Sequence, residues 1–282
     1  MRRTPLDLQR PGVTPVAAAP ANDVSSNYIA SGNEIEVFER AFARRLPLLI
    51  KGPTGCGKTR FVEHMAERLG VPMWTVSCNE DTSAADLVGR YILRGTETPW
   101  IDGPLTQAVR QGGICYLDEV VEARQEAIVI LNSLADYRRT LFIDKTAETL
   151  RAPAHFMLVA SYNPGYQSTL RDLKESVKQR FVAIHFDYPS PPIEARIVAT
   201  ESGCGIDLAT ALTRYGVRAR ELVGNGLFEG VSTRMLIHAA ALIDGGELAS
   251  ELLEAALVDP ITDDPNVRAT LRGLLSLVKA RP

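Results

Sequence analysis

The chain has 282 residues, of which 45% are hydrophobic and 23% are charged, and its formal net charge is −3. These proportions are ordinary for a globular protein with one large domain or two modest ones. The slightly acidic balance argues against a protein whose main task is to grip nucleic acid. No apolar run approaches the ~20 residues that cross a bilayer, and no targeting segment is visible. We therefore expect a cytoplasmic protein that is not embedded in a membrane.

The first part of the chain predicts an α/β core. Residues 1–26 contain four prolines and an alanine run, which indicates a flexible tail. An amphipathic helix is expected over residues 34–45, after which short apolar strands alternate with helical segments. Such alternation predicts a parallel sheet with helices on both faces, within a domain spanning 27–188. The expected strands are 47–51, 73–77, 113–117, 155–161 and 181–186, and the expected helices lie near 58–69, 104–111, 123–136 and 170–179.

The character of the sequence changes after Asp187. Three prolines occur between residues 189 and 192, which marks a boundary and a possible hinge at 187–192. The remainder has helical periodicity without strands, so residues 189–282 are predicted to form a separate small all-α domain. Its expected helices are 193–202, 206–222, 233–244, 247–257 and 266–280.

Residues 52–59 form a complete phosphate-binding loop, Gly-Pro-Thr-Gly-Cys-Gly-Lys-Thr, between an expected strand and an expected helix. Its glycines allow backbone N–H groups to surround phosphate oxygens at a helix N-terminus. Lys58 can reach the β- and γ-phosphates, and the Thr59 hydroxyl can bind Mg²⁺. A glycine-rich turn without a ligand is the alternative. The predicted nucleotide-binding residues are Gly52, Pro53, Thr54, Gly55, Cys56, Gly57, Lys58, Thr59 and Arg60.

Two adjacent carboxylates follow the apolar strand at 113–117, about 60 residues after the phosphate-binding lysine. At this distance they suit Mg²⁺-dependent hydrolysis of a nucleotide. Asp118 is expected to hold Mg²⁺ through its water shell, beside Thr59. Glu119 is expected to act as the general base that polarises the attacking water. A strand that simply ends in a solvated acidic turn is the alternative.

Three more polar residues are candidates for catalysis together with Lys58 and Glu119. Asn163 follows an apolar run and can hydrogen-bond the γ-phosphate or the attacking water, unless it only begins an Asn-Pro turn. Arg180 can project into the nucleotide site of a neighbouring subunit, unless it is a solvated arginine at a helix end. Ser232 or Thr233 is expected to cap a helix, which leaves Arg234 free to reach a phosphate or to remain on the surface.

These five elements occur in the order, and near the spacing, of the AAA+ ATPases. In that resemblance they are Walker A, Walker B, sensor 1, the arginine finger and sensor 2, and it covers residues 45–245. The resemblance implies an αβα core with a five-stranded parallel sheet, a small helical lid domain, and the cofactors ATP and Mg²⁺. Within AAA+ proteins, residues 86–105 resemble the hairpin insertion in helix 2 of the MoxR group, and residues 140–150 resemble its second hairpin.

Longer strings resemble the CbbQ/NorQ (NirQ) subfamily, namely residues 51–58, 78–81, 116–125 and 161–168. Members of that subfamily are hexameric ATPases that work with a partner carrying a von Willebrand A domain. CbbQ-type members release inhibitory sugar phosphates from Rubisco, whereas NorQ-type members help to mature nitric oxide reductase. The resemblance therefore implies a homo-hexameric remodelling motor with such an adaptor and a client enzyme. We favour the CbbQ type, with the NorQ type as the alternative.

Two other readings remain open at this point. A nucleotide-binding scaffold would not need water-activating groups such as Glu119. A DNA-acting AAA+ protein would need basic hairpin tips, whereas the second hairpin mixes Asp144, Lys145 and Glu148. In the first hairpin, Tyr91 and Trp100 are either groups that grip a client or cross-strand packing partners. Whether Arg234 acts on the nucleotide of its own subunit or of a neighbour is also open.

Overall fold

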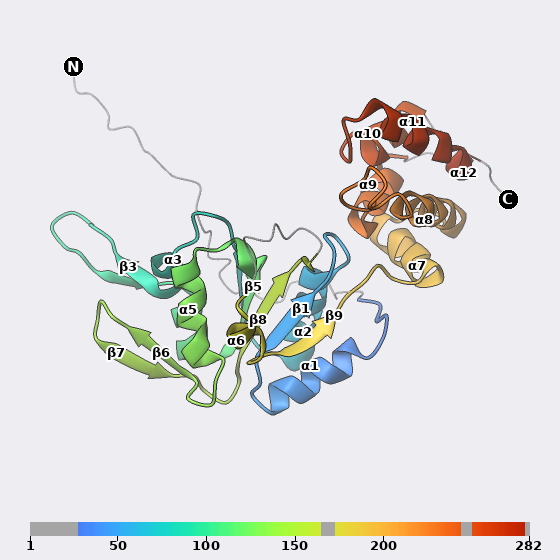
Figure 1. Ribbon diagram of the computed structural model, residues 1–282. Helices are drawn as coiled ribbons and strands as arrows, with labels where there is room; N and C mark the ends of the chain where they lie inside the picture. Colours follow the sequence, from blue (N-terminus) through green and yellow to red (C-terminus); the bar gives the residue numbers. More distant parts are fainter. Residues whose placement is uncertain (1–27, 165–172, 244–249, 280–282) are drawn as a thin grey trace, which may run out of the picture.

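The structure is a computed structural model that describes residues 28–164, 173–243 and 250–279. The flexible tail expected at residues 1–26 lies outside the described residues. Two layers of helices enclose a parallel sheet, and a group of helices follows at the C-terminal end of the chain (Figure 1). The α/β class predicted from the sequence is confirmed.

Five parallel strands make up the central sheet, in the order β2-β5-β8-β1-β9. A strand buried on both faces needs a continuous apolar sequence, and all seven residues of β8 are buried. The crossovers place the carboxyl ends of all five strands along one edge, where ligands bind in open α/β sheets. The strands are β1 (Leu48–Lys51), β2 (Met73–Ser77), β5 (Gly113–Asp118), β8 (Phe156–Tyr162) and β9 (Val182–His185).

Helices cover both faces of this sheet. On one side, α1 (Glu34–Ala43) and α2 (Lys58–Leu69) pack against Leu48 and Ile50. On the other side, α3 (Ala84–Val88), α4 (Pro104–Gln111) and α5 (Gln125–Leu134) pack against Leu49. The alternation of side chains along β1 thus divides the core into two hydrophobic clusters.

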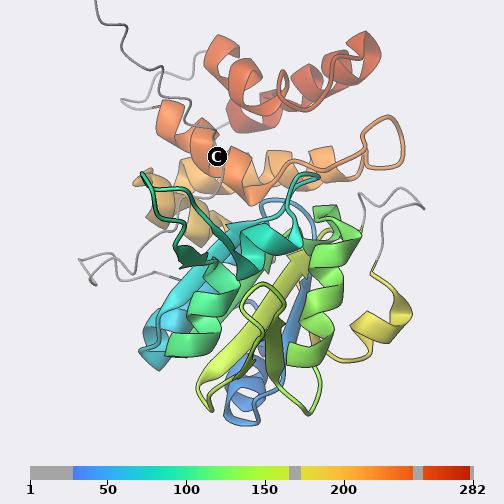
Figure 2. The ribbon, with the colours of Figure 1, turned by 90° about the vertical axis from the view of Figure 1, so that its left-hand side faces the viewer.

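Two β-hairpins extend from the α3–α4 side of the core (Figures 1 and 2). The first pairs β3 (Gly89–Tyr91) with β4 (Trp100–Asp102), and the second pairs β6 (Thr140–Ile143) with β7 (Glu148–Arg151). Arg110 of α4 joins them, because its guanidinium forms ion pairs with Asp102 at 2.8 Å and with Glu148 at 2.5 Å. The two hairpins are therefore anchored to one helix.

The aromatic residues of the first hairpin pack against each other. The rings of Tyr91 and Trp100 meet edge to face at 5.3 Å, and the indole N–H of Trp100 donates to Asp102 at 2.7 Å. This geometry favours the interpretation of Trp100 as a cross-strand packing partner. Tyr91 is half exposed, and its hydroxyl donates to the carbonyl oxygen of Lys145 in the second hairpin.

Between β8 and β9 a helix is expected over 170–179. Of the described residues in that range, 173–179, only those of α6 (Glu175–Lys178) are helical, and residues 165–172 lie outside the described part of the chain. A short 3₁₀ helix, η1 (Val120–Glu122), follows β5 directly.

The C-terminal helices surround a hydrophobic core of their own. In Figure 2 they lie above the upper end of the sheet. The segment expected over 266–280 is two helices, because the turn at Leu275 interrupts it. None of the described helices combines the length and the apolar character that a bilayer crossing requires. The helices are α7 (Pro191–Ser202), α8 (Ile206–Arg220), α9 (Thr233–Leu242), α10 (Ser250–Leu257), α11 (Pro265–Leu274) and α12 (Ser276–Lys279).

Candidate nucleotide site

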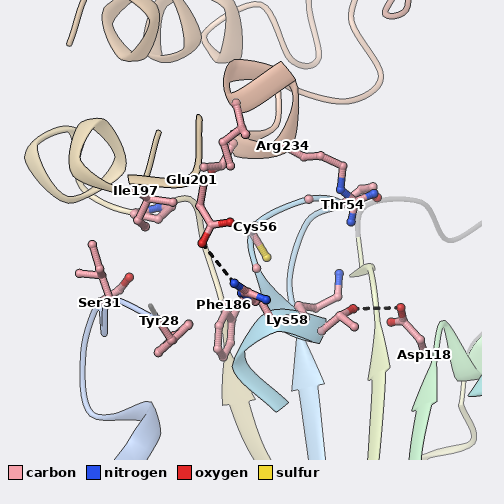
Figure 3. A pocket seen from close by; sticks show the side chains of 18 of the residues that line it. Tyr28, Ser31, Thr54, Cys56, Lys58, Asp118, Phe186, Ile197, Glu201 and Arg234 are labelled. Carbon is pink, nitrogen blue, oxygen red and sulfur yellow. Dashed lines mark hydrogen bonds and ion pairs between the residues drawn. The ribbon is translucent and has the colours of Figure 1, made fainter. Parts of the chain in front are cut away.

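A cavity of about 420 Å³ lies between the carboxyl edge of the sheet and the C-terminal helices. Residues 54–59 of the phosphate-binding loop line it together with Asp118 and Glu119 at one end. Apolar side chains line the other end, including Tyr28 and Phe186 from the core and Ile197 from α7 (Figure 3). A polar end and an apolar end within one cleft suit a molecule that has phosphates at one end and a flat ring at the other.

The loop adopts backbone conformations that favour glycine at two positions. Gly57 has φ of +103° and Gly55 has φ of +68°, both in the left-handed region. At Gly55 space is restricted as well, because a Cβ there would lie 2.7 Å from the Cβ of Ser232. After Gly57 the chain enters α2 at Lys58, so the N-terminal N–H groups of that helix face the cavity, which favours an anion.

Lys58 is buried at the bottom of the loop. Its ammonium group donates to the carbonyl oxygens of Gly52 at 2.8 Å and Pro53 at 3.0 Å, and it lies 3.7 Å from the Glu119 carboxylate. A buried charge is tolerated only with such partners. The lysine is thus held beside the loop, where it can exchange these oxygens for those of a phosphate.

Asp118 and Thr59 meet as a Mg²⁺ site requires. The Thr59 hydroxyl donates to Oδ2 of Asp118 at 3.2 Å (Figure 3). The other oxygen, Oδ1, accepts hydrogen bonds from Tyr116 at 2.8 Å and from Ser161 at 2.5 Å. One hydroxyl and one carboxylate oxygen, with room in the cavity for water and phosphate, fit the hard oxygen ligands that Mg²⁺ prefers. These residues fit the ion that the sequence predicts.

Glu119 has an unusual backbone and a perturbed carboxyl group. Its φ and ψ are 53° and 48°, the left-handed region that non-glycine residues seldom adopt. Burial raises the pKa of Glu119 above its ordinary value, and the charge of Asp118 raises it further. Lys58 and the main-chain N–H of Asn163 act in the opposite direction. A raised pKa makes the carboxylate a stronger base than an exposed glutamate.

Asn163 is buried at the end of β8, next to the loop. Its side-chain amide donates to the carboxylate of Glu229 at 2.6 Å and to the Thr54 hydroxyl at 3.3 Å. Thr54 also donates to the same carboxylate at 2.9 Å. The structure therefore joins the predicted sensor amide, the phosphate-binding loop and a carboxylate that the sequence analysis did not single out.

An ion pair crosses the cavity at its apolar end. Arg60 of α2 lies 3.4 Å from Glu201 of α7, and it also approaches Glu63 at 3.8 Å (Figure 3). This contact links the core to the C-terminal helices over the space that a nucleotide would fill. Cys56 is buried in the loop, and burial raises its pKa to about 11, so its thiol stays neutral at physiological pH.

The two predicted arginines lie in different places. Arg234, in the first turn of α9, lines the cavity and extends toward Thr54 (Figure 3). The hydroxyl of Ser232 caps α9 by accepting from the N–H of Met235 at 3.3 Å, which confirms Ser232 as the N-cap. Arg234 therefore faces the nucleotide site of its own subunit.

Arg180 lies away from that cavity. It precedes β9, whose first residue Val182 pairs with Leu48 at the start of β1, whereas the phosphate-binding loop follows the end of β1. The start and the end of β1 are three residues apart, which corresponds to roughly 10 Å along the strand. The guanidinium of Arg180 instead donates to the carbonyl oxygen of Ser176, within its own helical turn.

Sequence reasoning missed several residues around the site, including Tyr116, Ser161, Glu201 and Glu229, which form polar contacts there. For Tyr116 and Ser161 a signal existed. Tyr116 lies two residues before Asp118, so the side chains of both residues lie on one face of β5. Ser161 follows Ala160, which pairs with Leu117 of β5, so Ser161 lies beside Asp118. For Glu201 and Glu229 there was none, because their positions depend on how the C-terminal helices pack against the core.

Comparison with known proteins places the chain in a family. A family profile described as "AAA domain (dynein-related subfamily)" matches residues 47–181, and one described as "CbbQ/NirQ/NorQ C-terminal" matches residues 194–278. The chain is 55% identical to Protein NorQ of Paracoccus denitrificans, over 89% of this chain and 93% of that one. It is 56% identical to Protein CbbQ of Hydrogenophilus thermoluteolus, over 87% of this chain and 92% of that one.

A solved structure supports the fold independently. The crystal structure of a putative ATPase from Cytophaga hutchinsonii superposes with a TM-score of 0.52 at 16% identity, covering 92% of each chain. At this identity the likeness concerns the fold alone. The family is shown by the sequence matches along both halves of the chain, which agree with the phosphate-binding loop and the paired carboxylates: the chain belongs to the AAA+ ATPases, in the CbbQ/NirQ/NorQ group.

Proposed function

We propose that this protein is the ATPase subunit of a ring-shaped remodelling motor, in which each active site is shared by two neighbouring copies. The position of Arg180 carries the proposal. This arginine lies near the N-terminal ends of the strands, whereas its own phosphate-binding loop lies at their C-terminal ends, and it does not line its own cavity. We infer that it completes the site of another copy. A closed ring gives every site such an arginine. The resemblance to hexameric relatives supports six subunits.

The residues divide the work of ATP hydrolysis among them. The loop N–H groups and Lys58 bind the β- and γ-phosphates, while Thr59 and Asp118 hold Mg²⁺, which would neutralise phosphate charge when bound. Glu119 takes a proton from the attacking water, and Asn163 positions that water or the γ-phosphate. Arg234 from the same subunit and Arg180 from its neighbour stabilise the charge that develops on the transferred phosphoryl group.

For the client, we propose Rubisco, with an adaptor that carries a von Willebrand A domain. On this account, ATP-dependent lid movement drives the ring to release tightly bound sugar phosphates from the inhibited enzyme. The similarity to a CbbQ protein at 56% identity supports this assignment. The mixed charge at the tip of the second hairpin, Asp144 and Lys145, gives no reason to prefer nucleic acid as the client.

Nitric oxide reductase is the second candidate client. The observation in its favour is that a NorQ protein is as similar to this chain, at 55% identity over 89% of its length. The site described above is the same for both functions, since it concerns ATP and not the client.

One experiment separates these clients. The purified protein and its adaptor are incubated with sugar-phosphate-inhibited Rubisco and ATP, and carboxylation is followed over time. We expect carboxylation to recover with the wild-type protein, and not with Lys58→Ala. Continued inhibition of Rubisco while ATP is being hydrolysed would contradict the Rubisco assignment, and the same preparation would then be assayed for activation of nitric oxide reductase.

A further inference from the structure

A carboxylate from the lid reaches into the catalytic edge of the core. Glu229 lies in the segment between α8 and α9, and its Oε1 accepts hydrogen bonds from the Asn163 amide at 2.6 Å and the Thr54 hydroxyl at 2.9 Å. Asn163 is buried, and it follows β8 by one residue. Hydrogen bonds that involve a charged partner are shorter and stronger than neutral ones, as the 2.6 Å distance indicates. The lid thus binds the sensor amide directly.

The same amide is the group proposed to hydrogen-bond the γ-phosphate. Thr54 belongs to the phosphate-binding loop, and Lys58 of that loop lies 3.7 Å from the general base Glu119. The main-chain N–H of Asn163 also acts on the Glu119 carboxylate. A γ-phosphate in this loop would therefore be near the Asn163 amide and near the negative charge of Glu229. Both N–H groups of this amide are already used, by Glu229 and by the Thr54 hydroxyl, so a phosphate must displace one of these partners and is repelled by the carboxylate.

Contacts of the residues just after Glu229 hold its segment against the phosphate-binding loop. The Tyr188 hydroxyl lies 3.4 Å from the carbonyl oxygens of both Thr54 and Gly230. Ser232 approaches Gly55 so closely that a Cβ at that glycine would lie 2.7 Å from the serine Cβ. Because Ser232 is also the N-cap of α9, displacement of Glu229 is transmitted to a helix of the lid.

From this arrangement we propose that Glu229 is a positioning residue that senses the γ-phosphate. Without a triphosphate it holds the Asn163 amide and keeps the lid on the loop. ATP displaces the carboxylate from the amide, whereas ADP, which has no γ-phosphate, leaves it in place. Glu229 thereby couples the phosphate state of the nucleotide to the position of α9. The inference rests on the proposed nucleotide site and adds to it a group that distinguishes ATP from ADP.

The test measures nucleotide affinity, with Mg²⁺ present throughout, for ADP and for the slowly hydrolysed analogue ATPγS. Glu229→Gln keeps the acceptor oxygen and the shape of the side chain but removes the charge. We expect the ratio of the ADP to the ATPγS dissociation constant to rise about tenfold, which corresponds to ~1.4 kcal/mol. The control is Glu221→Gln, which removes an equal charge from an exposed lid residue whose partner is Arg218.

A second measurement asks whether Glu229 acts through Asn163. In an Asn163→Ala background, the amide that the carboxylate occupies is gone, so Glu229→Gln should change the ratio by less than about threefold. An unchanged ratio in the single variant, or a full tenfold rise in the double variant, would overturn the inference. Failure of the wild-type protein to bind either nucleotide would instead overturn the nucleotide site itself, so the two failures are distinguishable.

Discussion

At the scale of single residues, the end of β5 carries the chemistry. Asp118 and Glu119 are adjacent in sequence, yet the structure assigns them different surroundings. Asp118 accepts three hydroxyl hydrogen bonds, from Thr59, Tyr116 and Ser161, which fix both of its oxygens. Glu119 turns away because its backbone is left-handed, and its carboxylate lies 3.7 Å from Lys58. This difference supports the proposal that Asp118 holds a metal ion and that Glu119 accepts a proton.

The first prediction concerns these two roles. Glu119→Gln should bind ATP with wild-type affinity but hydrolyse it about 10²- to 10⁴-fold more slowly, because the proton acceptor is lost. Lys58→Ala should lose binding, since the main cationic contact to the phosphates is removed. Equilibrium binding and steady-state phosphate release measure the two effects. The control is Glu126→Gln, an exposed glutamate in the first turn of α5. Wild-type turnover by Glu119→Gln would show that another group is the base.

The raised pKa of Glu119 also predicts how the rate of ATP hydrolysis depends on pH. The carboxyl must be deprotonated to act as a base, so hydrolysis should fall as the pH is lowered through the pKa of Glu119. Because burial raises that pKa, the decline should begin at a higher pH than for an ordinary glutamate.

At the scale of elements, a buried ion pair organises the lid. Glu194 of α7 is fully buried and accepts from Arg220 of α8 at 2.6 and 2.8 Å and from the Thr233 hydroxyl of α9 at 2.6 Å. The guanidinium of Arg220 also lies 3.7 Å from the ring centroid of Tyr188, in the segment between core and lid. Three lid helices and the connecting segment thus meet at one carboxylate.

The second prediction follows from the cost of an unpaired buried charge. Glu194→Ala should lower the free energy of unfolding by about 3 kcal/mol, because Arg220 would lose its carboxylate in a largely buried position. Urea unfolding, followed by circular dichroism, measures the change. Glu221→Ala, which removes an exposed partner of Arg218, should cost under ~1 kcal/mol and serves as the control. Equal stability of the two variants would contradict the structural role of Glu194.

Local elements were largely predictable from the sequence, and contacts between distant elements were not. The strands at 73–77 and the helices at 58–69 and 104–111 have the predicted bounds, because apolar period and glycine or proline at the ends mark them. The helix predicted over 170–179 has wrong bounds, since of the described residues there, 173–179, only 175–178 are helical. The partners Glu194–Arg220 and Asn163–Glu229 are 26 and 66 residues apart, and no local pattern reveals them.

At the scale of the whole molecule, one chain contains nearly all of the proposed ATP site. Between core and lid meet the loop, both carboxylates, Asn163 and Arg234. Arg180 lies instead near the N-terminal ends of the strands. The sequence predicted the members of this set, since each follows a strand or begins a helix. It could not show which of the two arginines faces its own nucleotide, because that depends on the packing of α9 over the loop.

The most direct test of the shared site uses two variants that should each be inactive. Lys58→Ala should lose nucleotide binding. Arg180→Ala should lack the arginine that, in our proposal, each subunit donates to its neighbour, which should lower turnover about 10³- to 10⁵-fold. In rings assembled from equal amounts of both, some interfaces combine an intact loop from one subunit with an intact arginine from the next. Phosphate release by the mixture should then recover to about a quarter of the wild-type rate, if subunits assort at random. Full activity of Arg180→Ala alone, or no recovery in mixed rings confirmed by their size, would contradict hydrolysis between subunits.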